Sequence, residues 1–266
     1  MFSAVPGTAD APGLVGWFEI RGSDGLDRCG DAVVLRHLAD GSAAVVMVDV
    51  AGHGRACAHL SFYASTHLMA LLAVGTPPAE VARLADLDLR LERGSGAPAF
   101  VTAFIARLDP ASAQLRYASA GHETALLLHA DGTHDELSAN GPALGFLEAA
   151  DFAQTAVSYR DGDRLVVVTD GVTESRDDQG RMFGTTGVVR AAARARQARA
   201  CPHHIIAAAQ AHASDGLRDD ACALIIDTTL LAEFSVPADR TSRLLREIPR
   251  GARPDLATTH FRRAAP

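Results

Sequence analysis

Acidic residues stand beside apolar runs at four places in this chain. Runs of five or six residues rich in valine and isoleucine are typical of buried strands, and a carboxylate at the end of such a strand is held at the rim of a sheet. A single aspartate in this position is commonly a turn residue. Four of them predict a shared site, and they are Asp31 after Gly30, Asp49 after the run 45–48, Asp170 after the run 166–168, and Asp219-Asp220 before the run 221–226.

The donor chemistry of these positions indicates which metal they would bind. Hard divalent cations such as Mg²⁺ and Mn²⁺ prefer carboxylate, carbonyl and water oxygens, and they do not favour thiolates. The four cysteines show no paired spacing, which excludes a zinc ribbon, and we expect them to be reduced and mostly buried. The sequence therefore predicts a magnesium or manganese site.

Composition limits the kinds of partner that the chain can bind. With 266 residues and 48% hydrophobic content, the chain can bury a substantial core in one large domain or two small ones. No apolar stretch approaches the roughly 18 to 20 residues of a membrane span, and Met1–Pro12 lacks a basic segment followed by an apolar one. A net charge of −7 argues against nucleic acid as a partner. We therefore expect a soluble cytoplasmic protein that binds neither membrane nor nucleic acid.

Every basic residue in the chain other than histidine is arginine. The complete absence of lysine excludes a P-loop lysine, a protein-kinase lysine and a Schiff-base lysine. Several large classes of enzyme are removed by this observation alone.

Apolar periodicity predicts more strands than helices. Short links predict antiparallel neighbours, including hairpins across Ala120–Glu123 and across Arg160–Asp163. Because pairs of helices separate blocks of strands, we expect a layered α+β sandwich and not a doubly wound sheet. The expected strands are 14–20, 31–38, 43–49, 100–108, 114–119, 124–129, 153–159, 164–169 and 221–227, and the expected helices are 55–74, 79–92, 187–199 and 202–214.

The composition changes after Thr229. The segment 230–266 contains four prolines and seven arginines, with one possible short helix at Asp239–Glu247. We therefore expect one main domain over residues 1–229, followed by a C-terminal extension (230–266) with the composition of a partly disordered tail.

Seven motifs follow one another over about two hundred residues, in an order that resembles a known family. The order is that of the metal-dependent protein serine/threonine phosphatases of the PPM (phosphatase 2C) type, and specifically of their bacterial SpoIIE-like branch. The resemblance covers about Gly22 to Thr228, and its motifs are Gly30-Asp31, Asp49-Val50-Ala51-Gly52-His53-Gly54, Ser119-Ala120-Gly121-His122, Gly141-Pro142-Ala143-Leu144-Gly145, Thr169-Asp170-Gly171-Val172-Thr173-Glu174, Met182-Phe183-Gly184 and Asp219-Asp220.

The resemblance implies a fold and a set of metal ligands. Two antiparallel sheets would stack face to face between outer helices in an α-β-β-α sandwich, with two Mn²⁺ or Mg²⁺ ions at one end. Asp49 would bridge the ions, Asp170 and Asp219 would complete one shell, and Asp31 and the main-chain carbonyl of Val50 would serve the other. Asp219 is favoured over Asp220 because the second position is often not acidic in relatives.

The resemblance also implies an activity. The chain would be a hydrolase that removes phosphate from phosphoserine or phosphothreonine through a metal-bridging water, without a covalent phosphoenzyme. Its substrate would be a small phosphorylated regulator of the anti-sigma-factor antagonist type, in bacterial signalling or stress response. Two alternatives remain: a catalytically weak regulatory binding module with the same fold, and a phosphoesterase acting on small molecules. Retention of all four aspartates weighs against the binding module.

Several further residues near these motifs have a structural as well as a functional interpretation. His53, the candidate catalytic residue, lies in a tight turn and could orient water, donate to the leaving oxygen or hold the turn. For His122 a structural role is favoured. Glu174 either supports the site or is an exposed glutamate at a helix start. Arg28 and Arg55 flank two acidic motifs and are either phosphate ligands or solvated side chains.

Overall fold

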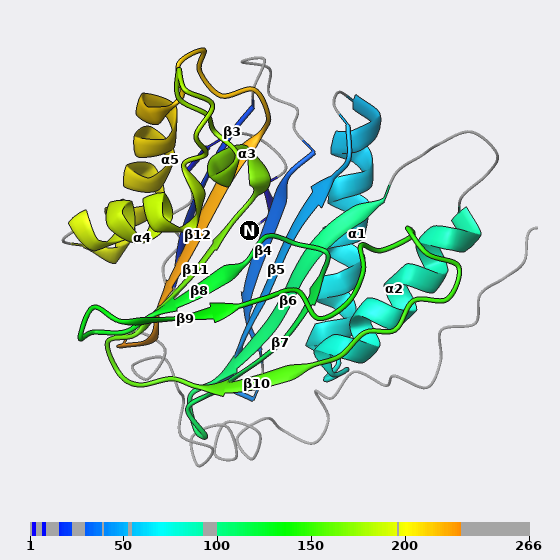
Figure 1. Cartoon of the computed structure of the whole chain (residues 1–266). Helices are drawn as coiled ribbons and strands as arrows, with labels where there is room; N and C mark the ends of the chain where they lie inside the picture. The colour runs from blue at the N-terminus through cyan, green and yellow to red at the C-terminus, as the bar shows by residue number, and fades with distance from the viewer. Residues whose placement is uncertain are drawn as a thin grey trace, which may run out of the picture. The chain divides into compact units, whose positions relative to one another are not determined.

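The computed structural model describes residues 2–3, 7–8, 16–22, 30–38, 40–52, 55–92, 100–195 and 197–229. Two antiparallel sheets of six strands each form the centre of the fold (Figure 1). The first sheet has the order β1 (Phe2–Ser3), β4 (Ala32–His37), β5 (Ala43–Val50), β6 (Val101–Asp109), β7 (Gln114–Ala120) and β10 (Thr155–Ser158). The second has the order β2 (Gly7–Thr8), β3 (Gly16–Arg21), β12 (Ala221–Asp227), β11 (Arg164–Val168), β8 (Ala125–Leu128) and β9 (His134–Leu137).

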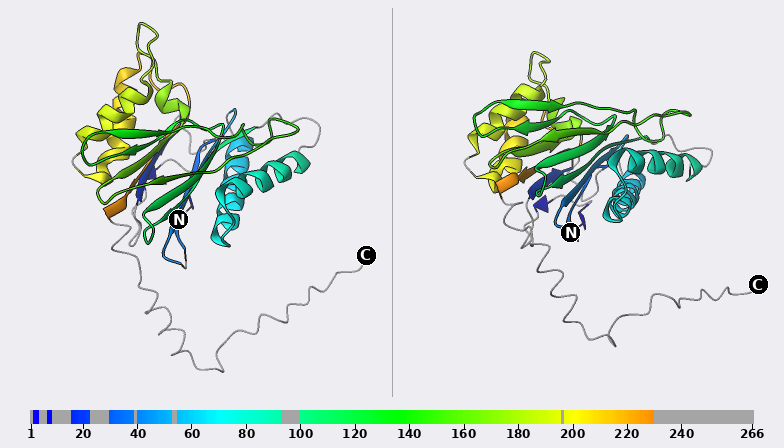
Figure 2. Two further views of the ribbon diagram at one scale, coloured as in Figure 1. Left: turned by 60° about the horizontal axis from the view of Figure 1, so that its bottom comes forward. Right: turned by 90° about the horizontal axis from the view of Figure 1, so that it is seen from below.

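Helices cover the outer faces of both sheets. The pair α1 (Arg55–Ala73) and α2 (Pro78–Glu92) packs on the first sheet, and the pair α4 (Gly184–Arg194) and α5 (Cys201–His212) packs on the second. Both views of Figure 2 place the two pairs on opposite sides of the sheets. The layers are therefore α-β-β-α, as the sequence predicted.

The apolar runs are continuous because the central strands are buried on both faces. In β5 the side chains of Val45 and Met47 enter the core between the sheets, while those of Val46 and Val48 enter the core under α1 and α2. This alternation is the two-residue period of a strand. Strand β11 divides its side chains in the same way between the inner core and the helices α4 and α5.

Two predicted hairpins are wrong. The link Ala120–Glu123 joins β7 of the first sheet to β8 of the second, and the link Arg160–Asp163 joins β10 of the first sheet to β11 of the second. Both links bury a polar side chain, His122 and Asp163 respectively, where a hairpin turn would expose it. Each link therefore turns a corner between sheets.

Other differences are smaller. The helix expected to reach residue 199 ends at Arg194, and a one-turn 3₁₀ helix (Ala198–Ala200) precedes α5. The four-residue helix α3 (Asp170–Thr173) and the strand β9 were not predicted. Helix α2 begins at Pro78, a position where proline lacks only a hydrogen bond that the first turn does not need.

The predicted extension 230–266, with its possible helix at Asp239–Glu247, lies outside the described residues, and the boundary near Thr229 stays a prediction. In the described part of the chain no helix combines the length and the apolar character needed to cross a bilayer.

Candidate metal centre

One end of the sandwich gathers the acidic residues, because strand ends of both sheets meet there. Asp49 lies at the end of β5 and Asp31 directly before β4, which pairs antiparallel with β5. Asp170 follows β11, and Asp219 lies just before β12, its antiparallel neighbour. In Figure 1 this end carries the short helix α3. The four predicted aspartates therefore come from the same end of the two sheets.

Thr169 connects Asp31, one of the two aspartates from the first sheet, to the second sheet. Its hydroxyl donates to Oδ2 of Asp31 at 2.9 Å and accepts from the main-chain N–H of Cys222 at 2.9 Å. Both Thr169 and Asp31 are almost fully buried. This bond fixes one carboxylate relative to β12.

Asp219 and Asp220 have different surroundings. The buried carboxylate of Asp220 accepts from the main-chain N–H of Gly30 at 2.8 Å, and so holds the chain that leads into Asp31. The exposed Asp219 accepts from the N–H of Asp220 at 2.8 Å and lines a cavity with Asp170. This division supports Asp219 as the candidate ligand, with Asp220 positioning the loop.

Glycines allow the close approach of these segments. A Cβ at Gly30 would lie 2.8 Å from the carbonyl oxygen of Val50, and a Cβ at Gly171 would lie 2.0 Å from the carbonyl oxygen of Asp220. Both distances are too short for a side chain. The main chain of Val50, the fifth predicted ligand, therefore lies directly against the Gly30-Asp31 segment.

The carboxylates raise one another's affinity for protons. Burial, and then the negative charges of Asp170 and Asp219, raise the pKa of Asp49 to about 7. Burial, followed by the charges of Asp219 and Glu174, raises the pKa of Asp170 to about 6. Burial and the charge of Asp49 hold the pKa of Asp31 well above its usual range, although its bond from Thr169 opposes this. Mutual repulsion of this kind is relieved when a cation binds.

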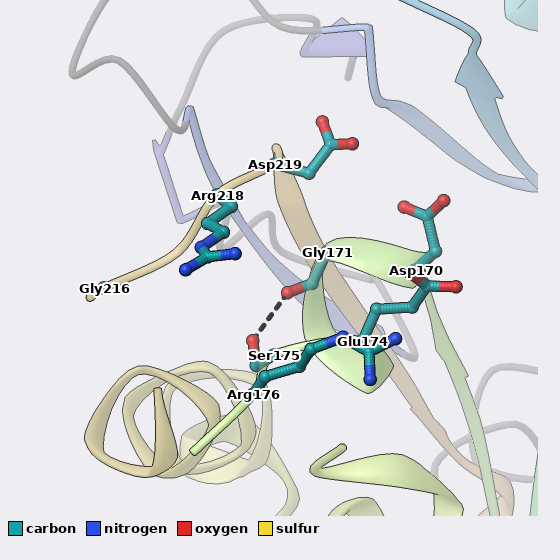
Figure 3. A pocket seen from close by; sticks show the side chains of 8 residues that line it. All are labelled: Asp170, Gly171, Glu174, Ser175, Arg176, Gly216, Arg218 and Asp219. Carbon is teal, nitrogen blue, oxygen red and sulfur yellow. Dashed lines mark hydrogen bonds between the residues drawn. The ribbon is translucent and has the colours of Figure 1, made fainter. Parts of the chain in front are cut away.

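The ligand atoms at this end are of the kind that a hard divalent cation prefers, although they are not arranged around a single point. Within the described ranges, no three His, Cys, Asp or Glu side chains are arranged so that they could hold an ion as they stand. The donors that meet at this end are oxygens, which suit Mg²⁺ or Mn²⁺. Figure 3 shows the carboxylates of Asp170 and Asp219 projecting to the same side.

His53, the candidate catalytic residue, lies outside the described residues, as do Arg28 and the side chain of Arg55. Their roles stay predictions. His122 is described and buried, with Nδ1 2.9 Å from the hydroxyl of Thr102, the residue opposite Asp49 in the β5–β6 register. Burial lowers the pKa of His122 to about 4, so its ring is neutral near pH 7. These contacts support the structural role favoured for it.

Two glutamates add to the negative charge. Glu123 accepts from the hydroxyl of Thr173 at 3.0 Å, and both Glu123 and Glu174 raise the pKa of Asp170. Glu174 is exposed, but it follows the short helix α3 and does not start a helix. Thr169 and Glu123 were not predicted as parts of the site. Their only signal was that Thr169 precedes Asp170 within one motif and that Glu123 directly follows another, which ends at His122.

Comparison with known proteins identifies the family. The model of a family described as Stage II sporulation protein E (SpoIIE) matches residues 39–229, which is more than half of the chain. The chain belongs to the SpoIIE family. Among curated relatives of this SpoIIE-family chain, phosphoserine phosphatase RsbU of Bacillus subtilis (strain 168) is 32% identical over 137 residues, which are 51% of this chain and 40% of RsbU. Phosphoserine phosphatase RsbP of the same strain is 29% identical over 132 residues, which are 49% of this chain and 33% of RsbP.

These matches cover about a third to two fifths of the two curated relatives. Solved structures also resemble the SpoIIE-family chain. The SiaA-PP2C domain of Pseudomonas aeruginosa matches with a TM-score of 0.68 at 24% identity, over 80% of this chain and 85% of that one. The PP2C phosphatase domain of SpoIIE from Bacillus subtilis matches with a TM-score of 0.71 at 15% identity, over 80% of this chain and 63% of that one. These likenesses confirm the predicted α+β fold class, and the family match confirms the resemblance that the motifs indicated.

Proposed function

We propose that the chain is a metal-dependent phosphoprotein phosphatase acting on phosphoserine or phosphothreonine. The observation that carries the proposal is the meeting of Asp31, Asp49, Asp170 and Asp219 at one end of the sandwich, where burial and neighbouring negative charges raise the pKa of the first three. An unrelieved cluster of this kind is costly to the fold, and such clusters are typical of functional sites. The relatives named phosphoserine phosphatase support the same activity.

Each residue then has a role. Asp49 would contact both of two Mn²⁺ or Mg²⁺ ions, Asp170 and Asp219 would hold one of them, and Asp31 and the Val50 carbonyl would hold the other. When bound, such a pair supplies a nucleophilic water of lowered pKa and neutralises phosphoryl oxygens. Thr169 orients Asp31, and Asp220 fixes the main chain at Gly30. Both bonds reduce the reorganisation needed when the site fills.

For the substrate, we propose a small phosphorylated regulator of the anti-sigma-factor antagonist type, in bacterial signalling. The support is the SpoIIE family match and the relatives RsbU and RsbP. The two rival functions are a regulatory module that has kept the fold without turnover, and a phosphoesterase for small molecules.

Hydrolysis of an aryl phosphate tests the proposal. Activity should vanish in EDTA and return when excess Mn²⁺ is added, and Mg²⁺ in its place would show which ion serves better. Full activity in excess chelator would contradict the two-metal site, and no activity with either ion would favour the regulatory module. A panel of phosphoserine peptides, nucleotides and sugar phosphates then separates a protein phosphatase from a small-molecule phosphoesterase.

A further inference from the structure

A cavity beside the candidate metal centre carries two arginines that the proposed chemistry does not use. Its volume is about 250 Å³, and its lining comprises Asp170, Gly171, Glu174, Ser175, Arg176, Gly216, Arg218 and Asp219. In Figure 3 the carboxylates of Asp170 and Asp219 project to one side, the guanidinium group of Arg218 lies away from them, and that of Arg176 overlaps Glu174 in this view. We call Asp170 and Asp219 the acidic rim of the cavity, and Arg176 and Arg218 its basic rim.

Local contacts place the first arginine. Arg176 follows α3 in a narrow turn that pairs it with Met182, and its Nη1 donates to the carbonyl of Gly180 at 3.0 Å. The hydroxyl of Ser175, the preceding residue, donates to the carbonyl of Gly171 at 2.8 Å. The turn that carries Arg176 is therefore fastened to the segment that carries Asp170.

Arg218 comes from the turn before β12, where its Nη2 donates to the exposed carboxylate of Asp215 at 2.6 Å. A guanidinium group has five N–H donors in a planar fork. The bonds of Arg176 and Arg218 therefore leave donors on both side chains for a ligand. Guanidinium groups match carboxylate and phosphate oxygens with paired hydrogen bonds.

We infer that Arg176 and Arg218 bind an acidic side chain of the phosphoprotein substrate, close in sequence to the phosphorylated residue. The inference rests on the proposed phosphatase function, because the phosphoryl group must lie at the rim formed by Asp170 and Asp219. The phosphoryl group then lies at the acidic rim, and the acidic side chain of the substrate lies at the basic rim. An acidic side chain at the basic rim is attracted by two arginines and avoids the repulsion that it would meet beside Asp170.

The geometry of an extended peptide sets the spacing. A cavity of about 250 Å³ leaves room for a side chain beside the phosphoryl group. In an extended peptide, side chains two positions apart point the same way and are separated by about 7 Å. The acidic residue therefore lies two positions before or after the phosphorylated residue, and a peptide with glutamine there binds less tightly.

Binding of matched peptides to the full chain with Mn²⁺ tests this inference independently of catalysis. Two labelled peptides carry a non-hydrolysable phosphonate analogue of phosphoserine, and they differ only in having glutamate or glutamine at both positions two residues away. By fluorescence anisotropy, we expect the wild type to bind the glutamate peptide about tenfold more tightly at low salt. The double variant Arg176→Gln and Arg218→Gln should bring this ratio close to one.

A matched control and a charge reversal keep the test sharp. Arg83→Gln removes an exposed arginine of α2 that pairs with Glu80, and it should retain the wild-type ratio. Arg218→Glu changes an exposed side chain, so that the fold should persist even if the turn tolerates no change at Arg176. It should shift the preference toward a peptide with lysine in place of glutamate.

Two results would overturn the inference. One is equal binding of the two peptides by the wild type. The other is an equal loss of affinity for both peptides in the double variant, which would place the arginines on the phosphoryl group itself. Phosphate release from the corresponding phosphoserine peptides reports separately on the proposed function: if neither peptide is hydrolysed, the phosphatase proposal fails, while the binding ratio still decides the role of the arginines.

Discussion

Strands β11 and β12 lie side by side, and carboxylates stand at both ends of this pair. At one end, the buried Asp163 accepts from the main-chain N–H of Arg160 at 2.9 Å and lies 3.1 Å from Nδ1 of His129. Beside it, Asp227 lies 3.5 Å from Nε of Arg164. At the other end, burial, followed by the charges of Asp219 and Glu174, raises the pKa of Asp170 to about 6. The pair β11–β12 thus has carboxylates with donors and basic partners at one end, the matched end, and carboxylates that repel one another at the other, the acidic end.

The difference between the two ends of this strand pair distinguishes carboxylates with a structural role from carboxylates with a functional one. A buried carboxylate with its donors in place stabilises the corner where it lies, because its hydrogen bonds replace those it made with water. A group of carboxylates that repel one another lowers stability unless something else binds them. Local rules of folding are broken at the acidic end and obeyed at the other end, and such violations are expected at functional sites.

The largest expected difference between the two ends is in catalysis. With Mn²⁺ present, Asp49→Asn or Asp170→Asn should reduce kcat for an aryl phosphate at least about a hundredfold, roughly 2.7 kcal/mol of transition-state stabilisation. Asp163→Asn, at the matched end, should change kcat less than about threefold. Steady-state kinetics on all three variants checks this. An Asp49→Asn variant that is folded and fully active would remove Asp49 from the candidate metal centre.

Two glycines provide the next comparison. Gly171→Ala should cost about 3 kcal/mol and reduce activity, because the new Cβ would meet the carbonyl of Asp220 at 2.0 Å and push the start of β12 away. Gly162→Ala, at the other end of β11, should cost only about 1 kcal/mol through its φ of +85° and leave kcat unchanged. Urea unfolding and aryl phosphate kinetics measure both effects. Equal costs at the two positions would show that the acidic end tolerates backbone movement.

In the absence of metal, replacing an aspartate by asparagine should change thermal stability in opposite directions at the two ends. Asp49 has a folded pKa of about 7, above its unfolded value, so its cost to stability is absent below about pH 4 and complete above about pH 7. In EDTA at pH 8, Asp49→Asn should therefore keep or raise Tm. Asp163→Asn should lower Tm, at a cost of about 2 kcal/mol, because it weakens a buried acceptor. Thermal unfolding of the two variants side by side decides the point, and a fall in Tm for both would mean that Asp49 is held structurally.

His129 gives the smallest effect. Its hydrogen bond with Asp163, together with the charges of Asp163 and Asp135, raises its pKa. The stabilisation is therefore complete below the unfolded pKa near 6.5 and is lost as the pH rises through the folded pKa. In urea unfolding at pH 6 and pH 8.5, His129→Gln should reduce the difference between the two free energies of unfolding, by less than about 1 kcal/mol because solvent screens the pair. An unchanged difference would show that Asp163 is held by the N–H of Arg160 alone.

The sequence predicted the strands that matter most for the site. Strand β12 has the expected bounds Ala221–Asp227, and the apolar runs of β5 and β11 were visible because both faces of these strands are buried. Strand β9 was missed because three of its four residues are exposed and polar, so it shows no apolar pattern. Helix α3 was missed because four residues are too few to show a helical period.

Pairing between distant segments was not predictable in the same way. The links at Gly121 and Gly162 have the composition of hairpin turns, and nothing local indicates that β7 pairs with β10 while β8 pairs with β11. The contact from Thr169 to Asp31 joins residues 138 positions apart. The separate environments of Asp219 and Asp220 likewise arise only when Gly30 reaches the start of β12. Four strand-end aspartates could be found from the sequence, but the bonds that hold them depend on tertiary contacts.

The bond between the N–H of Gly30 and the carboxylate of Asp220 spans 190 residues, and β3 pairs with β12 over a similar separation. On a ribosome that adds about 5 to 20 residues per second, the second partner emerges roughly 10 to 40 seconds after the first. During that interval the edge of β3 that β12 will cover is open to chaperones or to neighbouring nascent chains. The acidic centre cannot form until the last strand arrives, so a prematurely terminated product would lack Asp219 and would have no complete site.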